Sequence, residues 1–272
     1  MKIAFVLDHP LMHYRVPFFN LLSRKFDHKV SVFHAGNKLD SNEIFFEQII
    51  VEKKKILKIF DYRKGLDLTS FDIVVCMQNM RLLNLWNITL KQHRSYKLIH
   101  WGIGVSSSKG LRSQSNSIRI IRNFLMRFAD AVVFYSAYPL QFVKKSLKDK
   151  CFIALNTIEN SLSVDLSPFP KDALIFIGSL NRRKGLQETI IAFHQYLQRN
   201  PKNIRKLFII GEGEEYANLS EYISSNGLEN NILLLGKIEN EEEKKKYFKK
   251  SIASISLNQA GLSVLESFSF GV

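Results

Sequence analysis

A short basic loop in the second half of the chain has the residue types that bind phosphate. Arg182, Arg183 and Lys184 follow the apolar run that ends at Gly178, and a helix is predicted to begin at Gly185. The three cations would lie at the carboxyl end of a strand, where they could neutralise a diphosphate. An ordinary turn with surface charge is the alternative interpretation.

The last stretch, QAGLSVLESFSF, predicts a tight turn followed by a helix with one apolar face. The amides of Gly261, Leu262 and Ser263 would point from the helix N-terminus toward an anion. Glu266 lies one turn into the helix, where its carboxylate suits the two hydroxyls of a ribose better than a phosphate. Alternatively, Glu266 is a solvated helix residue.

Two further strand ends in this half carry glycine. IIGEGEEYANL places Gly211 in a Gly-x-Gly turn, although the third glycine of a dinucleotide fingerprint is missing. LLLGKI ends on Gly236 and Lys237. Each signal is weak alone, but all four stretches follow one another in a single order.

The first half offers side chains rather than glycines. DHPLMHYRVPFF follows the first predicted strand, and in it Arg15 could reach a phosphate while His13 could bind a donor or acceptor sugar. LIHWGIG places His100 and Trp101 at another strand end. Loop packing for His13 and Arg15, and a core position for His100, are the alternatives.

These candidates need a scaffold that gathers strand ends. Apolar strands alternate with helical patterns at the spacing of βαβ units, which predicts an α/β fold with parallel sheets and helices on both faces. TIENSLSVDLSPFPKD has two prolines and no helical stripe, so we place a linker at 161–172. We predict two Rossmann-like domains, at 1–160 and 173–272, with ligands bound at the carboxyl ends of their strands.

Composition limits the function further. The chain has 272 residues, is 46% hydrophobic and carries a formal net charge of +14, which serves either solubility or binding to an anionic partner. No run of about 18 apolar residues and no secretory signal is visible, so a cytoplasmic protein is expected. No zinc-finger, RNP or helix-turn-helix pattern supports nucleic-acid binding.

One predicted helix combines basic and apolar residues. SIRIIRNFLMRF interleaves Arg119, Arg122 and Arg127 with isoleucines and phenylalanines. Such a helix either packs on the sheet or lies on an anionic membrane surface, and we favour packing.

The ordered motifs of the second half resemble the donor-binding domain of GT-B glycosyltransferases, specifically glycosyltransferase family 4. Gly178–Gly185 looks like the family's G-R-L-x-x-x-K-G segment, Ile210–Leu219 is similar to G-x-G-x-E-x-x-x-L, and Asn258–Glu266 is similar to E-G-F-G-L-x-x-L-E. ADAVVFYSAY and FIALNTIEN resemble family segments of the first half.

The resemblance implies a retaining transferase that moves a sugar from a nucleotide-sugar to a glycan or lipid-linked acceptor in surface polysaccharide synthesis. Lys184 would hold the donor diphosphate and Glu266 the ribose, with the base near Gly236 and Lys237. The leaving diphosphate would accept the acceptor's proton, so neither a protein nucleophile nor a metal or other cofactor is expected.

The chain departs from the family pattern at two positions. The family's arginine falls at Ser179, so Arg182 or Arg183 must substitute, and the first glutamate falls at Asn258. Asn258 can bind sugar hydroxyls but supplies no charge, and with His13 and His100 it forms our candidate catalytic set. A non-catalytic nucleotide- or glycan-binding fragment is the alternative, and an epimerase, for which only His194 is available in this half, ranks lower.

The chain stops just after the final motif, at Val272. In the family this helix is followed by another strand and further helices. We therefore expect the second domain to be incomplete and the chain to be C-terminally truncated.

Overall fold

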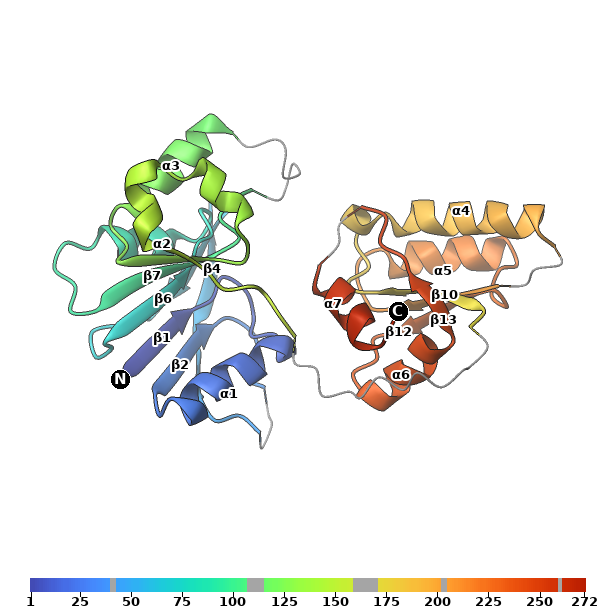
Figure 1. Ribbon diagram of the computed structural model, residues 1–272, viewed down its shortest axis with the longest axis horizontal. Helices are drawn as coiled ribbons and strands as arrows, with labels where there is room; N and C mark the ends of the chain where they lie inside the picture. Colours follow the sequence, from blue (N-terminus) through green and yellow to red (C-terminus); the bar gives the residue numbers. More distant parts are fainter. Residues whose placement is uncertain (40–42, 107–114, 159–170, 202–204, 259–260) are drawn as a thin grey trace. The chain divides into compact units, whose positions relative to one another are not determined.

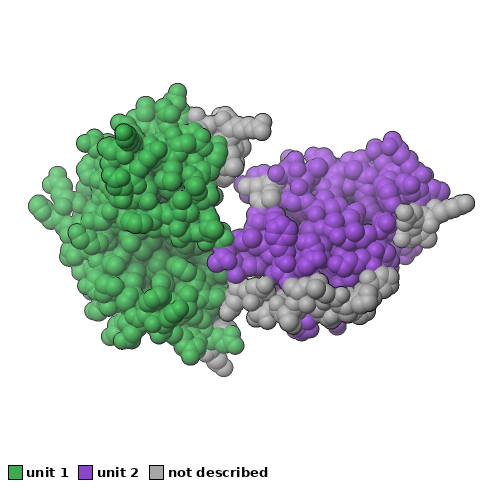
Figure 2. Space-filling model, viewed as in Figure 1, with its two compact units in different colours: residues 1–156 green, residues 157–272 purple. Residues whose placement is uncertain are grey.

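A computed structural model describes residues 1–39, 43–106, 115–158, 171–201, 205–258 and 261–272. The chain divides into two compact units, unit 1 at 1–156 and unit 2 at 157–272 (Figure 2). Except for Lys171 and Asp172, the predicted linker lies outside the described residues. Among the described residues, no helix is long and apolar enough to cross a bilayer.

Unit 1 is built on a seven-stranded sheet whose neighbouring strands all pair in parallel, in the order β3-β2-β1-β6-β7-β8-β9 (Figure 1). The central strands are short apolar runs because both of their faces are covered. The strands are β1 (Lys2–Val6), β2 (Lys29–His34), β3 (Glu47–Ile50), β6 (Ile73–Met77), β7 (Lys97–Gly102), β8 (Ala131–Phe134) and β9 (Cys151–Ile153).

Helices cover the two faces of this sheet. On one face, α1 (Val16–Lys25) buries Phe19 in a cluster with Phe5 and Trp101. On the other face, α2 (Leu83–Leu90) and α3 (Asn116–Met126) contribute to a second cluster. Pro17 stands in the first turn of α1, where its missing N–H leaves no bond unmade.

A separate antiparallel hairpin, β4 (Glu52–Ile56) with β5 (Phe60–Lys64), lies outside the main sheet. The sequence analysis missed β3, β4 and β5. EKKKI offers three consecutive lysines and every residue of β4 is exposed, so the alternation that marks a half-buried strand is absent.

Unit 2 contains a four-stranded parallel sheet in the order β12-β11-β10-β13. Its strands are β10 (Ala173–Ile177), β11 (Lys206–Ile210), β12 (Ile232–Gly236) and β13 (Ser251–Ser254). One face carries α4 (Leu186–Arg199) and α5 (Tyr216–Ser225). The other carries α6 (Glu241–Lys249), with the residues after α7 (Leu262–Ser269) packed beside it. The predicted α/β class with parallel sheets is confirmed.

Candidate functional site

The loops after β10 and β11 lie against one another in unit 2. The amide of Gly178 donates to the Ile210 carbonyl at 3.0 Å, and the amide of Leu180 donates to the Glu212 carbonyl at 2.8 Å. Gly211 allows this approach, because a Cβ there would lie 1.9 Å from the Gly178 carbonyl oxygen. The first two glycine motifs therefore form one backbone unit.

The basic loop and the last motif also come together. Lys184 ends a short 3₁₀ helix, and Gly185 then adopts the left-handed conformation (φ 68°) that starts α4. A Cβ on Gly185 would lie 2.6 Å from the Asn258 side-chain nitrogen. The Lys184 Nζ lies 3.8 Å from the position of a Cβ on Gly261, which immediately precedes α7. A lysine, an amide side chain and a helix N-terminus thus share one edge of the sheet.

The electrostatics of this edge favour an anion. Burial, followed by the neighbouring Arg183 guanidinium, lowers the pKa of Lys184 below its ordinary value. Arg183 is exposed and has no ion-pair partner among the described residues. An anion bound between Lys184 and Arg183 would favour the charged form of Lys184 and so raise its pKa again.

Arg182 is engaged differently from Arg183. Its Nε lies 3.2 Å from Glu215 Oε1, and its side chain is 83% exposed. A pocket of about 340 Å³ lies beside this pair, lined by Asn181, Arg182, Leu186, Gln187, Glu188, Glu215 and Asn218. Lys184, Asn258 and Gly261 do not line this pocket. Because these three residues come together at the strand ends of unit 2, we place the candidate site there and not in the pocket.

Glu266 already has a cationic partner. Its Oε1 lies 2.7 Å from the Nζ of Lys244, a buried lysine of α6 that also pairs with Glu241 at 2.5 Å. These hydrogen bonds keep the pKa of Lys244 above its ordinary value although burial lowers it. A ribose at Glu266 would therefore share the carboxylate with Lys244. Leu262 and Ser263, in the first turn of α7, are half-buried.

Lys237 follows the end of β12. The Gly211 amide donates to the Gly236 carbonyl at 2.7 Å, which places Lys237 next to the Gly-x-Gly turn. Its ammonium pairs with Glu239.

In unit 1, Arg15 forms the centre of a buried aromatic group. Its guanidinium lies 4.6 Å from the ring centre of Trp101, and Nη2 donates to the Tyr135 hydroxyl at 2.9 Å. Burial lowers the pKa of Arg15, but Tyr135 and Tyr14 more than offset this and leave it raised. Arg15 is 5% exposed, and its Nε has no partner among the described residues. His13, in the same 3₁₀ turn, is exposed.

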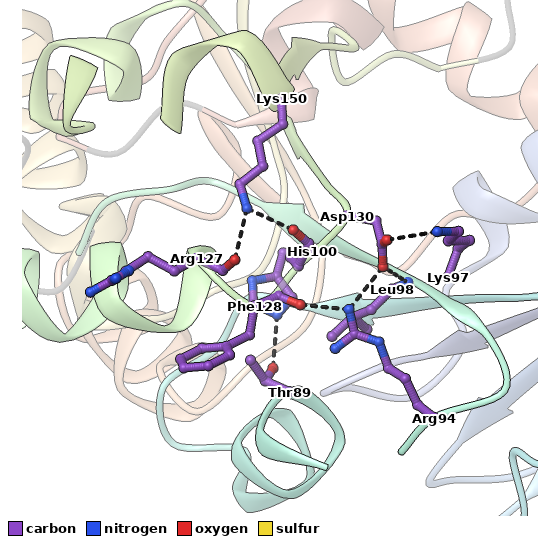
Figure 3. Close-up of polar contacts among 10 residues, drawn as sticks. Thr89, Arg94, Lys97, Leu98, His100, Arg127, Phe128, Asp130 and Lys150 are labelled. Carbon is purple, nitrogen blue, oxygen red and sulfur yellow. Dashed lines mark hydrogen bonds and ion pairs between the residues drawn. The ribbon is translucent and has the colours of Figure 1, made fainter. Parts of the chain in front are cut away.

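The structure corrects the catalytic assignment of His100. The residue is fully buried on the α2 face of β7, and its Nε2 lies 2.8 Å from the Thr89 hydroxyl (Figure 3). Burial, followed by the positive charges of Lys150 and Arg94, lowers its pKa to about 3. A neutral histidine enclosed in the core cannot contact a substrate, so His100 is a core residue.

Figure 3 also shows what surrounds His100. Arg94 donates to the Phe128 carbonyl and to Asp130, and Lys150 donates to the carbonyls of Arg127 and Ala129. These cations bind the carbonyls at the end of α3, where the helix macrodipole favours positive charge.

No sequence pattern singled out the buried Arg63 or the half-buried Asp8 and Asn79, which lie together in unit 1. Arg63 of β5 is buried and donates to the Asp8 carbonyl at 2.7 Å, while Asn79 donates to the Asp8 carboxylate at 2.7 Å. The position of Asp8 just after the first strand was the one sequence signal that could have indicated this polar group. Among the described residues, no cluster of three or more His, Cys, Asp or Glu side chains could hold a metal ion.

Three comparisons with known proteins bear on this geometry. Residues 162–272 match the family model of glycosyl transferases group 1. An uncharacterized glycosyltransferase of Methanocaldococcus jannaschii is 29% identical over 209 residues, which cover 70% of this chain and 50% of that protein. The chain thus spans about half the length of this curated relative.

Solved structures of low sequence identity share the fold. Anabaena HepE in complex with UDP has a TM-score of 0.66 at 14% identity, covering 100% of this chain and 79% of that one. S. aureus TarM has a TM-score of 0.66 at 11% identity (99% and 83% covered), and WaaG, a lipopolysaccharide glycosyltransferase, 0.62 at 14% (99% and 79%). This likeness establishes the GT-B type of fold.

Proposed function

We propose that this chain, whose residues 162–272 match the family model of glycosyl transferases group 1, transfers a sugar from a nucleotide-sugar donor to a glycan or lipid-linked acceptor. The observation that carries the proposal is the convergence of Lys184, Asn258 and Gly261 at the strand ends of unit 2. Cations beside a helix N-terminus provide what a diphosphate requires.

The donor would lie along this edge with its diphosphate at Lys184 and the first amides of α7. Arg183 is better placed than Arg182 to assist, because it already perturbs Lys184 electrostatically, whereas Arg182 pairs with Glu215. Glu266 would accept the ribose hydroxyls beside Lys244, and the base would contact Gly236 and Lys237 through their backbone. The complexes of HepE and TarM with UDP support a nucleotide as a ligand of this chain.

The transfer would retain the configuration of the sugar. The glycosidic bond to the diphosphate breaks as the acceptor oxygen attacks from the same face, and the departing diphosphate takes the acceptor's proton. Lys184 and the α7 amides stabilise the negative charge that develops on the diphosphate. This step needs no protein nucleophile, metal or other cofactor.

Asn258 favours a second candidate, a non-catalytic module that binds a nucleotide or glycan. Its amide packs against Gly185 and can hold a sugar hydroxyl, but it carries no negative charge to stabilise a cationic transition state. Both candidates bind the donor, but only the transferase would turn it over.

The acceptor would bind unit 1, where His13 is exposed for contact, whereas Arg15 is buried and would support the site from within the fold. WaaG takes part in lipopolysaccharide biosynthesis, and a TarM variant was solved with α-GlcNAc-glycerol; both support surface glycans as the acceptor class.

The protein would work in the cytoplasm, at the inner face of the membrane. α3 presents Ile120 and Phe124 to solvent beside Arg119, and the two residues after it, Arg127 and Phe128, are exposed as well. A helix with this composition can lie on anionic lipid.

A thermal-shift panel tests the donor site. We expect one of the UDP-, GDP-, ADP- or dTDP-sugars to raise the Tm of the chain, and Lys184→Ala to weaken the binding about 10- to 100-fold by removing a charge-assisted phosphate contact. Lys206→Ala, an exposed lysine at the amino end of β11, is the matched control and should leave the shift unchanged.

Two results would contradict the proposal. If no donor stabilises the chain, nucleotide-sugar binding is refuted. If a donor binds but no nucleotide is released with any glycan acceptor, the binding module replaces the transferase.

A further inference from the structure

The tip of the β4–β5 hairpin in unit 1 exposes a group of aliphatic side chains. Ile56, Leu57 and Ile59 are 41%, 80% and 62% exposed, and they follow one another around the turn. An isolated exposed leucine is ordinary, but three large exposed aliphatic residues within one hairpin turn together form an apolar surface. We call Ile56–Ile59 the hairpin tip.

The backbone of this tip is strained. Leu57 and Lys58 adopt φ values of 51° and 57°, and the Ile59 amide donates to the Ile56 carbonyl at 3.3 Å. Hairpin turns with two left-handed residues strongly prefer Asn-Gly, because glycine and asparagine enter this region at low cost. Leucine and lysine pay a higher conformational free energy in the left-handed region. Because the Leu57 side chain is exposed, its burial contributes little to offset this cost.

Lysines surround the apolar tip. The hairpin carries exposed Lys53, Lys54, Lys55, Lys58 and Lys64 against Glu52 and Asp61, a net charge of +3 without the buried Arg63. Lys53 pairs with Asp61 at 3.3 Å and Lys54 with Glu52 at 3.6 Å. Lys55 and Lys58 have no carboxylate partner among the described residues.

The hairpin is anchored to the fold close to its tip. The amide of Asp61, which pairs with Lys55 next to the turn, donates to the Arg81 carbonyl at 2.8 Å, just before α2. β5 contacts α2, and α2 contacts α3. This anchor lets the tip present its side chains without reordering the fold.

We propose that the hairpin tip inserts into the interface of an anionic lipid bilayer. Leu57 and its neighbouring isoleucines would enter the acyl boundary, while the flanking lysines extend their ammonium groups to lipid phosphates. The net charge of +3 around an apolar tip matches a negatively charged surface. The inference goes beyond the proposed sugar transfer, and binding to vesicles requires no donor or acceptor.

Sedimentation with vesicles of phosphatidylcholine and phosphatidylglycerol tests the proposal. Leu57→Asn/Lys58→Gly restores the favoured turn sequence, so we expect it to raise the Tm by about 2–4 °C while weakening vesicle binding at least about tenfold. Leu155→Asn replaces another leucine of unit 1 that is 74% exposed, and should leave binding unchanged. Wild-type binding should also weaken in pure phosphatidylcholine and at high salt.

A spectroscopic variant checks insertion directly. The emission of Leu57→Trp should shift to the blue on adding the anionic vesicles, whereas Leu155→Trp should not shift. The proposal is overturned if the wild type fails to bind, if the turn variant binds as well as the wild type, or if Leu57→Trp shows no shift. Sugar transfer without vesicle binding would refute the hairpin proposal alone.

Discussion

The two units differ in the groups that pack at the carboxyl ends of their strands. In unit 2 the loops approach one another closely at glycines, with Gly211 against the backbone of Gly178 and Gly185 against the side chain of Asn258. In unit 1 the corresponding edge is filled by side chains, with Arg15 stacked on Trp101 and Arg63 buried beside Asp8. One unit exposes amides and a lysine, and the other buries guanidinium groups.

This difference bears on how each edge can bind. Backbone amides at a close approach suit the invariant part of a ligand, such as a diphosphate. Side chains drawn from separate strands can vary without disturbing the sheet. We infer that unit 2 serves the common donor and unit 1 the variable acceptor.

The largest expected effect tests the backbone packing of unit 2. In Gly211→Ala the Cβ would meet the Gly178 oxygen at 1.9 Å, at a φ of 148° that alanine rarely adopts, so we expect a loss of about 3 kcal/mol or more. Hydrogen exchange of the β11 amides measures it, while tryptophan fluorescence reports unit 1 alone, since Trp86 and Trp101 both lie there.

Gly227→Ala is the matched control. Gly227 also has a positive φ, 63°, but a Cβ there meets nothing within 4 Å, so only about 1 kcal/mol of backbone cost is expected. Equal losses at the two positions would show that the close approach of the loops is unimportant.

The next effect concerns the buried side chains of unit 1. Because the pKa of His100 falls from 6.5 unfolded to about 3 folded, its contribution to stability is complete above pH 6.5 and decreases as the pH falls toward 3. The slope approaches about 1.4 kcal/mol per pH unit, which amounts to roughly 2 kcal/mol between pH 6.5 and 4.5.

His100→Gln should remove this one-proton slope from urea unfolding followed by tryptophan fluorescence. His34, whose pKa burial also lowers, and Asp130 retain their own pH dependence in both proteins. An unchanged slope in the variant would mean that His100 is not buried as a neutral ring.

The smallest effects compare one arginine from each unit. Arg15→Ala should cost about 2 kcal/mol, because it removes a buried stacking contact and the hydrogen bond to Tyr135. Arg182→Ala should cost less than about 0.5 kcal/mol, because its pair with Glu215 is exposed on the arginine side. Chemical denaturation of each variant measures the loss in the free energy of unfolding. Equal losses in the two variants would contradict the contrast between the units.

Most of the fold was predictable because apolar periodicity and glycine positions are local signals. The α/β class with parallel sheets was predicted, and the resemblance to GT-B glycosyltransferases is confirmed. The hairpin β4–β5 was missed because charged residues on both strands conceal its pattern. Membership of family 4, the retaining outcome and the site roles stay predictions.

The candidate site was predictable only in part. Placing Lys184 at a strand end followed from the motif, but its proximity to Gly261 depends on how β10 and α7 pack. His100 was assigned wrongly to the site because the motif does not show which face of β7 each residue occupies. Adjacent residues of a strand point to opposite faces. Both faces of β7 are covered, so Trp101 lies on the α1 face and His100 on the α2 face.

The sequence alone determined the α/β alternation, the order of the glycine motifs and the glycosyltransferase resemblance, since these depend on local backbone preferences and spacing. Tertiary structure decided which charges are buried and which are paired. Packing buried His100 and Arg15, paired Glu266 with Lys244 and left Leu57 exposed to solvent. Burial and charge partners depend on contacts between distant segments, and no local pattern encodes them.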